Sequence, residues 1–253
     1  MRASRWDPKA IEDKTPSAAS LYRFVRDIKD IEHKPLPRIY VSPEEDLSKL
    51  HAVVVGPPGT PYEDGFFHFF VKCSPSYPIK PPLVRLLTKD AGRVRFNPNL
   101  YACGKVCLSI LGTEIGLAWS PVQTISNLLL SIQSLLVKEP FLNEPLLAEA
   151  FLNDSHDYKR KLEHETIKVT VSNAVEACMQ ENPPCPLDLV AVIISEFTEH
   201  YDKYVRKVKS LLHLTGTVME KTFLGPNLED TTFQYKALLT RLMKLNEGLN
   251  STN

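Results

Sequence analysis

The sequence lacks several features that would assign it to common functional classes. It carries no net charge, because 30 Lys and Arg residues balance 30 Asp and Glu residues, so bulk charge does not favour nucleic acid or an anionic membrane. It contains no glycine-rich loop that would cradle a phosphate, no basic patch and no internal repeat. It also contains no apolar run long enough to span a bilayer, and its N-terminus does not resemble a signal peptide. We therefore expect neither nucleic acid nor a membrane among its partners.

Cysteine is scarce, and its copies make an odd number: Cys73, Cys103, Cys107, Cys178 and Cys185. We expect free thiols in a reducing compartment, the cytoplasm and nucleus, because an even number of cysteines is typical of a disulfide framework. The 253 residues, 43% hydrophobic and 24% charged, have the composition of a globular protein. They are enough for one large domain with an extension.

Apolar periodicity and the positions of proline predict a helix, then strands, then more helices. The predicted elements are a helix from Ser20 to the prolines at 35 and 37; strands over 50–55, 65–73 and 83–87; a helix capped by Ser120 with Pro121 at its first position; a helical segment over 146–180; and two amphipathic helices beyond the proline-rich stretch 182–186. Strands and helices that are segregated along the chain are typical of an α+β fold. We divide the chain into a flexible arm over 1–19, a core domain over 20–181 and a helical extension over 182–253.

The segment with the most chemical information runs over residues 97–111. An amide side chain, Asn99, precedes a thiol, Cys107, by eight residues, and Gly104 between them permits a tight turn. If the loop folds back, the amide N–H stands beside a carbonyl carried on the sulfur. A thiolate is a good nucleophile and a good leaving group, so the pair suits acyl transfer through a thioester. Taken singly, such a cysteine is more often a buried structural thiol, and an asparagine beside proline is more often a turn former.

Two other uses of these thiols have less support. Cys103 and Cys107 are four residues apart, but a zinc site needs two further ligands at usable spacing, so no metal is expected. A Cys-His-Asn hydrolase needs a histidine, and the downstream candidates fall on charged helical faces, where a histidine is ordinarily solvated. These candidates are His156, His164, His200 and His213. No protease signature surrounds Cys107.

Five separated motifs resemble, in order, those of the ubiquitin-conjugating enzymes. They are GPPGTPYEDGF at 56–66, YPIKPP at 77–82, NPN at 97–99, GKVCL at 104–108 and WSPV at 119–122. The resemblance covers about residues 20–170, and such an ordered set is far more specific than any one motif. It implies an antiparallel four-stranded sheet with flanking helices, followed here by a helical C-terminal extension.

The resemblance also implies roles for individual residues. Cys107 would hold ubiquitin as a thioester, Asn99 would stabilise the oxyanion when a substrate lysine attacks, and Glu144 would orient or deprotonate that lysine. The residues that match the surface for the activating enzyme and the ligases are Arg23, Arg26, Ile79, Pro121 and Val122. The implied partners are ubiquitin, an activating enzyme and ligases. No cofactor is implied, because the activating enzyme uses the ATP.

Three departures from the family pattern distinguish this chain. Asn97 replaces a histidine that buttresses the active-site loop, residues 112–117 lengthen the loop after Cys107, and Tyr22 stands where many members have lysine. The Asn97 variant, the lengthened loop, the segment FLNEP at 141–145 and the C-terminal extension together resemble the Z-type branch. This branch is associated with a second, non-standard ubiquitin-activating enzyme and a tandem-ubiquitin-like modifier. The conjugating domain of a giant apoptosis-inhibitor-type ligase is the nearest alternative. A non-catalytic ubiquitin-handling scaffold is the alternative from another class, but such scaffolds lack the thiol.

Overall fold

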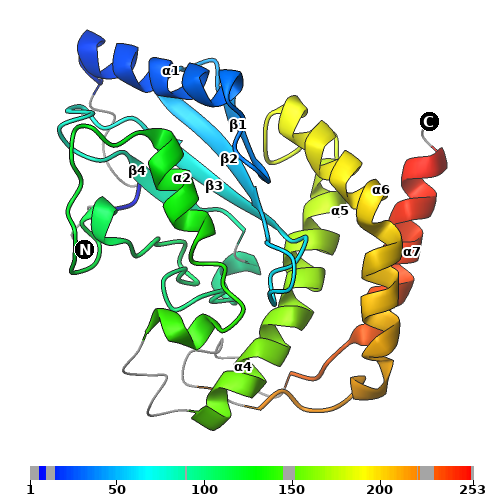
Figure 1. The fold of residues 1–253 in the computed structure, drawn as a ribbon. Coiled ribbons are helices and arrows are strands. Elements are labelled where there is room, and N and C mark those ends of the chain that lie inside the picture. Colours follow the sequence, from blue (N-terminus) through cyan, green and yellow to red (C-terminus); the bar gives the residue numbers. More distant parts are fainter. Residues whose placement is uncertain are drawn as a thin grey trace.

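A four-stranded antiparallel sheet lies at the centre of the fold (Figure 1). The computed structural model describes residues 6–9, 15–88, 90–144, 152–220, 222 and 231–251. The strands are β1 (Ile39–Pro43), β2 (Lys49–Val55), β3 (Phe66–Lys72) and β4 (Leu83–Leu86), and each pairs with the next. The last three match predicted strands to within one residue at each end. β1 has no counterpart among the predicted strands, because five residues that include Ser42 and Pro43 give no clear alternation.

Helices surround this sheet. They are α1 (Ala18–His33), α2 (Ile125–Gln133), α4 (Leu152–Glu165), α5 (Ala174–Cys178), α6 (Leu187–Ser210) and α7 (Tyr235–Ser251). A π-helical segment, η4 (Thr166–Asn173), connects α4 to α5, and the short 3₁₀ helices are η1 (Asp90–Gly92), η2 (Ser109–Leu111), η3 (Pro140–Asn143) and η5 (Leu212–Leu214). The predicted α+β class, with an antiparallel four-stranded sheet, flanking helices and a helical C-terminal region, is confirmed.

Two helix starts differ from the prediction. α1 begins at Ala18, two residues early, because the Ser17 hydroxyl caps it. The predicted start of α2 at Pro121 is wrong. The helix begins at Ile125, because Thr124 forms a capping box that satisfies the first free N–H groups there.

Side chains of the sheet alternate between two hydrophobic cores. Phe67 and Phe69 of β3 belong to the first core with residues of α1 and α2, whereas Phe66 belongs to the second core. Residues of η4, α5, α6 and α7 complete the second core on the other side of the sheet (Figure 1). Since both faces are covered, β3 is buried along its whole length, and its run of phenylalanines suits this position.

The described residues of the C-terminal half are mostly helical, as predicted. Residues 152–178 form one continuous helical segment within the predicted range, and residues 145–151 lie outside the described part of the chain. The two predicted amphipathic helices correspond to α6 and α7, which bury Phe197 and Leu242 in the second core. Within the described residues, none of the helices combines the length and apolar character that a membrane crossing needs.

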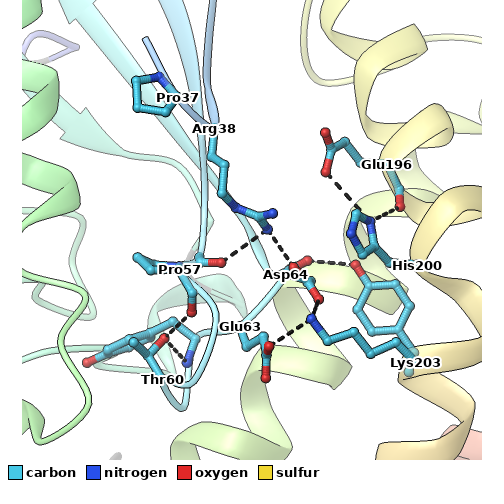
Figure 2. A network of polar contacts seen from close by, with 12 residues as sticks. Pro37, Arg38, Pro57, Thr60, Glu63, Asp64, Glu196, His200 and Lys203 are labelled. Carbon is cyan, nitrogen blue, oxygen red and sulfur yellow. Dashed lines mark hydrogen bonds and ion pairs between the residues drawn. The ribbon is translucent and has the colours of Figure 1, made fainter.

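A network of charges connects α6 to the loop between β2 and β3 (Figure 2). The carboxylate of Asp64, 3% exposed, pairs with Arg38 and with Lys203, whose Nζ lies 2.7 Å from Asp64 Oδ2. Lys203 also pairs with Glu63 at 2.7 Å, and the Tyr204 hydroxyl donates to the Asp64 carbonyl at 2.7 Å. Arg38 and Asp64 have φ of 60° and 57°, a conformation that such residues adopt when surrounding contacts hold it. The network therefore fixes the C-terminal helices on the sheet.

Part of the predicted N-terminal arm lies against β4. Asp7 is buried and pairs with Arg85, and the Trp6 ring lies 5.8 Å from the Arg85 guanidinium. The division of the chain into arm, core domain and extension stays a prediction.

Candidate active site

The loop that carries Cys107 folds back on itself between β4 and α2. Leu100 and Val106 form an antiparallel bridge, and the Cys107 N–H donates to the Asn99 carbonyl at 2.8 Å. Gly104 makes the turn possible, because its φ is +95° and a Cβ there would lie 2.6 Å from a carbonyl oxygen of β4. Two residues that are eight apart in the sequence are thereby brought into contact.

Asn97, which stands where the family pattern has histidine, supports this loop from within the core. Its side chain is fully buried, and its nitrogen donates to the Tyr62 hydroxyl at 2.9 Å and to the Leu135 carbonyl at 2.8 Å. Its oxygen accepts from the Asn99 N–H at 3.0 Å and from the Asn143 amide at 3.1 Å. Both polar atoms of the Asn97 side chain have hydrogen-bond partners. Asn97, which takes the place of histidine, therefore supports Asn99 through these hydrogen bonds.

The Asn99 side chain is almost fully buried, and both of its amide hydrogens have an acceptor. Nδ2 donates to the Cys107 carbonyl at 3.0 Å and to Glu114 Oε2 at 3.3 Å. Since both partners are oxygen acceptors, they fix the amide with its nitrogen toward them. Asn99 Oδ1 is buried without a hydrogen-bond partner among the described residues. One amide hydrogen is thus held by the main chain, and the other by a carboxylate.

The Cys107 thiol is half-buried and faces the lengthened loop. Its Sγ donates to the Thr113 carbonyl at 3.2 Å. The Thr113 hydroxyl accepts from the Leu108 N–H at 2.9 Å and donates to the Val106 carbonyl at 2.8 Å. Thr113 therefore binds the main chain on both sides of the cysteine and fixes the position of the thiol.

Burial is the main cause that raises the pKa of Cys107 above its ordinary value. Glu114 and Glu144 raise this pKa further, because a carboxylate repels a thiolate, whereas Lys105 and Arg95 lower it. Partial burial and the neighbouring Glu144 also raise the pKa of the Glu114 carboxyl group, whereas the hydrogen bond from Asn99 lowers it. The site therefore favours a neutral thiol at pH 7 and has two carboxylates near it.

The structure brings the three predicted catalytic residues into one region. Asn99 contacts Cys107 directly, and Glu144, at the end of η3, lies near enough for its charge to act on the thiol. Sequence reasoning assigned no role to Thr113 or Glu114, although they contact Cys107 and Asn99. Their only sequence signal is their position in the loop that departs from the family pattern.

A metal site and a Cys-His-Asn hydrolase would each need particular side chains close to the thiols. Cys103 is exposed, and among the described residues no cluster of three or more His, Cys, Asp or Glu side chains could hold a metal ion. The predicted solvated position of His164 is wrong. It is buried, because it hydrogen-bonds Glu165 at 2.9 Å and accepts from the Gln234 N–H at 3.0 Å. In the described part of the chain, the groups that hydrogen-bond the thiol of Cys107 or shift its pKa include no histidine.

The predicted partner-binding residues gather where α1 meets two loops. Arg23 on α1 donates to the Pro121 carbonyl at 3.3 Å, and the Trp119 indole donates to the Pro78 carbonyl at 2.7 Å. These bonds connect α1, the proline-rich loop before β4 and the loop before α2. Arg23 therefore holds this surface together, and the exposed side chains on it are Tyr22, Arg26, Ile79, Pro121 and Val122.

Comparison with known proteins shows the family of this chain. A family model described as ubiquitin-conjugating enzyme matches residues 23–170. The ubiquitin-conjugating enzyme E2 Z of Homo sapiens is 43% identical over 259 residues, covering 99% of this chain and 71% of that protein. The E2 Z of Xenopus tropicalis is 43% identical over 250 residues, covering 97% and 78%. The probable ubiquitin-conjugating enzyme E2 26 of Arabidopsis thaliana is 43% identical over 129 residues, covering 49% and 23%. The chain belongs to the ubiquitin-conjugating enzyme family and is a ubiquitin transferase.

Proposed function

We propose that this chain accepts the C-terminal acyl group of ubiquitin on Cys107 and passes it to a substrate lysine or to a ligase. The observation that supports the proposal most strongly is the hydrogen bond from Asn99 Nδ2 to the Cys107 carbonyl at 3.0 Å. It fixes an amide group beside the thiol in a loop that Asn97 holds from the core. An amide donor at this position suits the stabilisation of an oxyanion.

Charging exchanges one thioester for another. The Cys107 thiol loses its proton, and the sulfur attacks the carbonyl carbon that the activating enzyme holds on its own cysteine. A carbon–sulfur bond to Cys107 forms, the bond to the activating enzyme breaks, and the proton passes to the departing thiolate. The activating enzyme consumes the ATP, and a reducing cytoplasm or nucleus keeps Cys107 a free thiol.

Discharge depends on the groups around the sulfur. A thiolate whose pKa is raised is a poorer leaving group. When the lysine amine attacks, negative charge develops on the carbonyl oxygen, and the Asn99 N–H stabilises it. Glu144 orients or deprotonates the lysine. The amide bond forms as the carbon–sulfur bond breaks, and Cys107 returns to the thiol.

We infer that the activating partner is the second, non-standard ubiquitin-activating enzyme. The likeness to E2 Z proteins along nearly the whole chain supports this inference, because the branch is associated with that enzyme and with a tandem-ubiquitin-like modifier. Tyr22, 74% exposed on α1, replaces a lysine that many family members carry at the shared surface. The surface residues that would meet the activating enzyme and ligases in turn are Arg23, Arg26, Ile79, Pro121 and Val122.

Charging by each of the two activating enzymes tests the proposal. We expect that, with ATP and ubiquitin, the second enzyme produces an adduct of one ubiquitin per chain that a thiol reductant removes. An adduct that forms with the standard activating enzyme and not with the second one would reject the inferred partner, but it would support the thioester function of Cys107. The absence of an adduct with either enzyme would reject the thioester function and favour a binding scaffold.

Substitution of Asn99 by alanine is expected to slow discharge without preventing charging. Loss of one oxyanion donor costs about 10²-fold in rate, or about 3 kcal/mol, in a serine protease, which also transfers an acyl group. The measurement is the single-turnover decay of the ubiquitin adduct in the presence of free lysine. The extent of charging of the same variant is its control, because a misfolded site would fail to charge. Decay at the wild-type rate would remove the oxyanion role from Asn99.

A further inference from the structure

Glu114 lies in the active site but has no role in the charging and discharge steps proposed above. Its Oε2 accepts one N–H of Asn99 at 3.3 Å, and the other N–H of that amide donates to the Cys107 carbonyl at 3.0 Å. Because an amide nitrogen has two hydrogens, no third one remains for an oxyanion. The N–H that is not bound to the main chain is the one that Glu114 holds. Asn99 can therefore stabilise an oxyanion only when Glu114 releases it.

The surroundings of Glu114 suit a cation that comes from outside the chain. Among the described residues no cation acts on its carboxylate; the charge that acts on it is that of Glu144. Its side chain is exposed, and the next residue, Ile115, is fully exposed, so the loop is open to an acceptor on another protein. Both carboxylates also disfavour the Cys107 thiolate. That effect opposes charging, but the same negative potential attracts a nucleophile that arrives as an ammonium ion.

We propose that Glu114 binds the ammonium group of the acceptor lysine and takes its proton, and that this event releases the Asn99 N–H to the oxyanion. The inference rests on the proposed thioester function of Cys107. It makes Glu114 a second carboxylate of the reaction besides Glu144. It also couples arrival of the lysine to completion of the oxyanion site, so that the thioester is protected while no acceptor is bound.

The proton and electron balance of this step is complete. The lysine ammonium gives one proton to the Glu114 carboxylate, and the neutral amine attacks the thioester carbonyl. A carbon–nitrogen bond forms, and the negative charge on the carbonyl oxygen accepts a hydrogen bond from Asn99. When the intermediate collapses, the carbon–sulfur bond breaks, and the nitrogen loses a second proton to the Cys107 thiolate. Glu114 then returns its proton to water.

A comparison of two nucleophiles tests this role. The chain is charged, the activating enzyme is stopped, and the adduct decays in the presence of either free lysine or hydroxylamine, which is uncharged at neutral pH. The variant is Glu114→Gln, which keeps an acceptor for the Asn99 N–H but removes the negative charge. The matched control is Glu45→Gln, since Glu45 is an exposed carboxylate in the turn between β1 and β2.

We expect Glu114→Gln to slow decay with lysine by about 10²-fold or more, the lower limit for loss of a general base, and to leave decay with hydroxylamine unchanged. Glu45→Gln is expected to leave both unchanged. Equal slowing with both nucleophiles would overturn the proposal, because it would mean that Glu114 only positions Asn99. Unchanged decay with lysine would overturn it as well. Failure of the wild type to form any adduct would instead reject the underlying thioester function.

Discussion

Substitution of Cys107 by serine is expected to abolish the reducible ubiquitin adduct and to replace it with one that a thiol reductant leaves intact. A serine hydroxyl at this position forms an oxygen ester, which exchanges with thiols far less readily than a thioester does. The ester is also expected to persist longer with free lysine, because an alkoxide is a poorer leaving group than a thiolate. The measurement is electrophoresis of the charged protein with and without reductant, followed by mild alkali, which hydrolyses the ester.

The matched control for this substitution is Cys103→Ser. Cys103 lies four residues away in the same loop, and it is exposed, so reagents and partners reach it more easily than the half-buried Cys107. We expect Cys103→Ser to keep a fully reducible adduct. A reducible adduct that survives in Cys107→Ser and disappears in Cys103→Ser would mean that Cys103, and not Cys107, carries the acyl group.

Substitution of Asp64 by asparagine is expected to destabilise the fold strongly. The Asp64 carboxylate is buried and compensates two cations, Arg38 and Lys203, from different parts of the chain. Removing one member of a buried pair leaves charge uncompensated and costs about 3–5 kcal/mol, and the partial exposure of both cations favours the lower end, about 3 kcal/mol. Asparagine is the substitution of choice, since it tolerates the positive φ at this position. The measurement is the free energy of unfolding in urea.

Glu63→Gln provides the control for Asp64, because both carboxylates contact the same Lys203 amine at 2.7 Å. The Glu63 side chain is 32% exposed and Asp64 is 3% exposed, so solvent screens the first pair far more. An exposed pair contributes about 0–1 kcal/mol. Equal losses of stability in the two variants would contradict the role of burial in holding α6 on the sheet.

Local pattern predicted most of the fold, and competing or distant contacts explain the exceptions. β3 was predictable because its phenylalanines fill both faces of a covered strand. The start of α2 was misplaced because Ser120 and Pro121 carry the same signature as a true helix start, and the sequence does not show that Thr124 caps better. The burial of His164 depends on the main chain of Gln234, 70 residues away. No local pattern reveals such a contact.

Within the site, the sequence predicted the two residues that a tight turn brings together. It did not predict the residues of the following loop that contact them. Asn99 and Cys107 were predictable because Gly104 permits the reversal between them. Thr113 and Glu114 were not, because their contacts depend on how residues 112–117 close over the thiol. A threonine and a glutamate in an exposed loop are ordinary, so residue type alone gave no signal.

The most direct test of the thioester function is to identify the blocked thiol in the charged wild-type chain. Trypsin cleaves after Arg95, Lys105 and Lys138, so Cys103 and Cys107 fall in separate peptides, 96–105 and 106–138. The fully charged protein is treated with an alkylating reagent, with the uncharged protein as control. Both samples are then digested, and the peptide masses are measured by mass spectrometry. We predict that Cys103 is alkylated in both samples, whereas Cys107 is alkylated only in the uncharged protein. Alkylation of Cys107 in the fully charged protein would contradict the account.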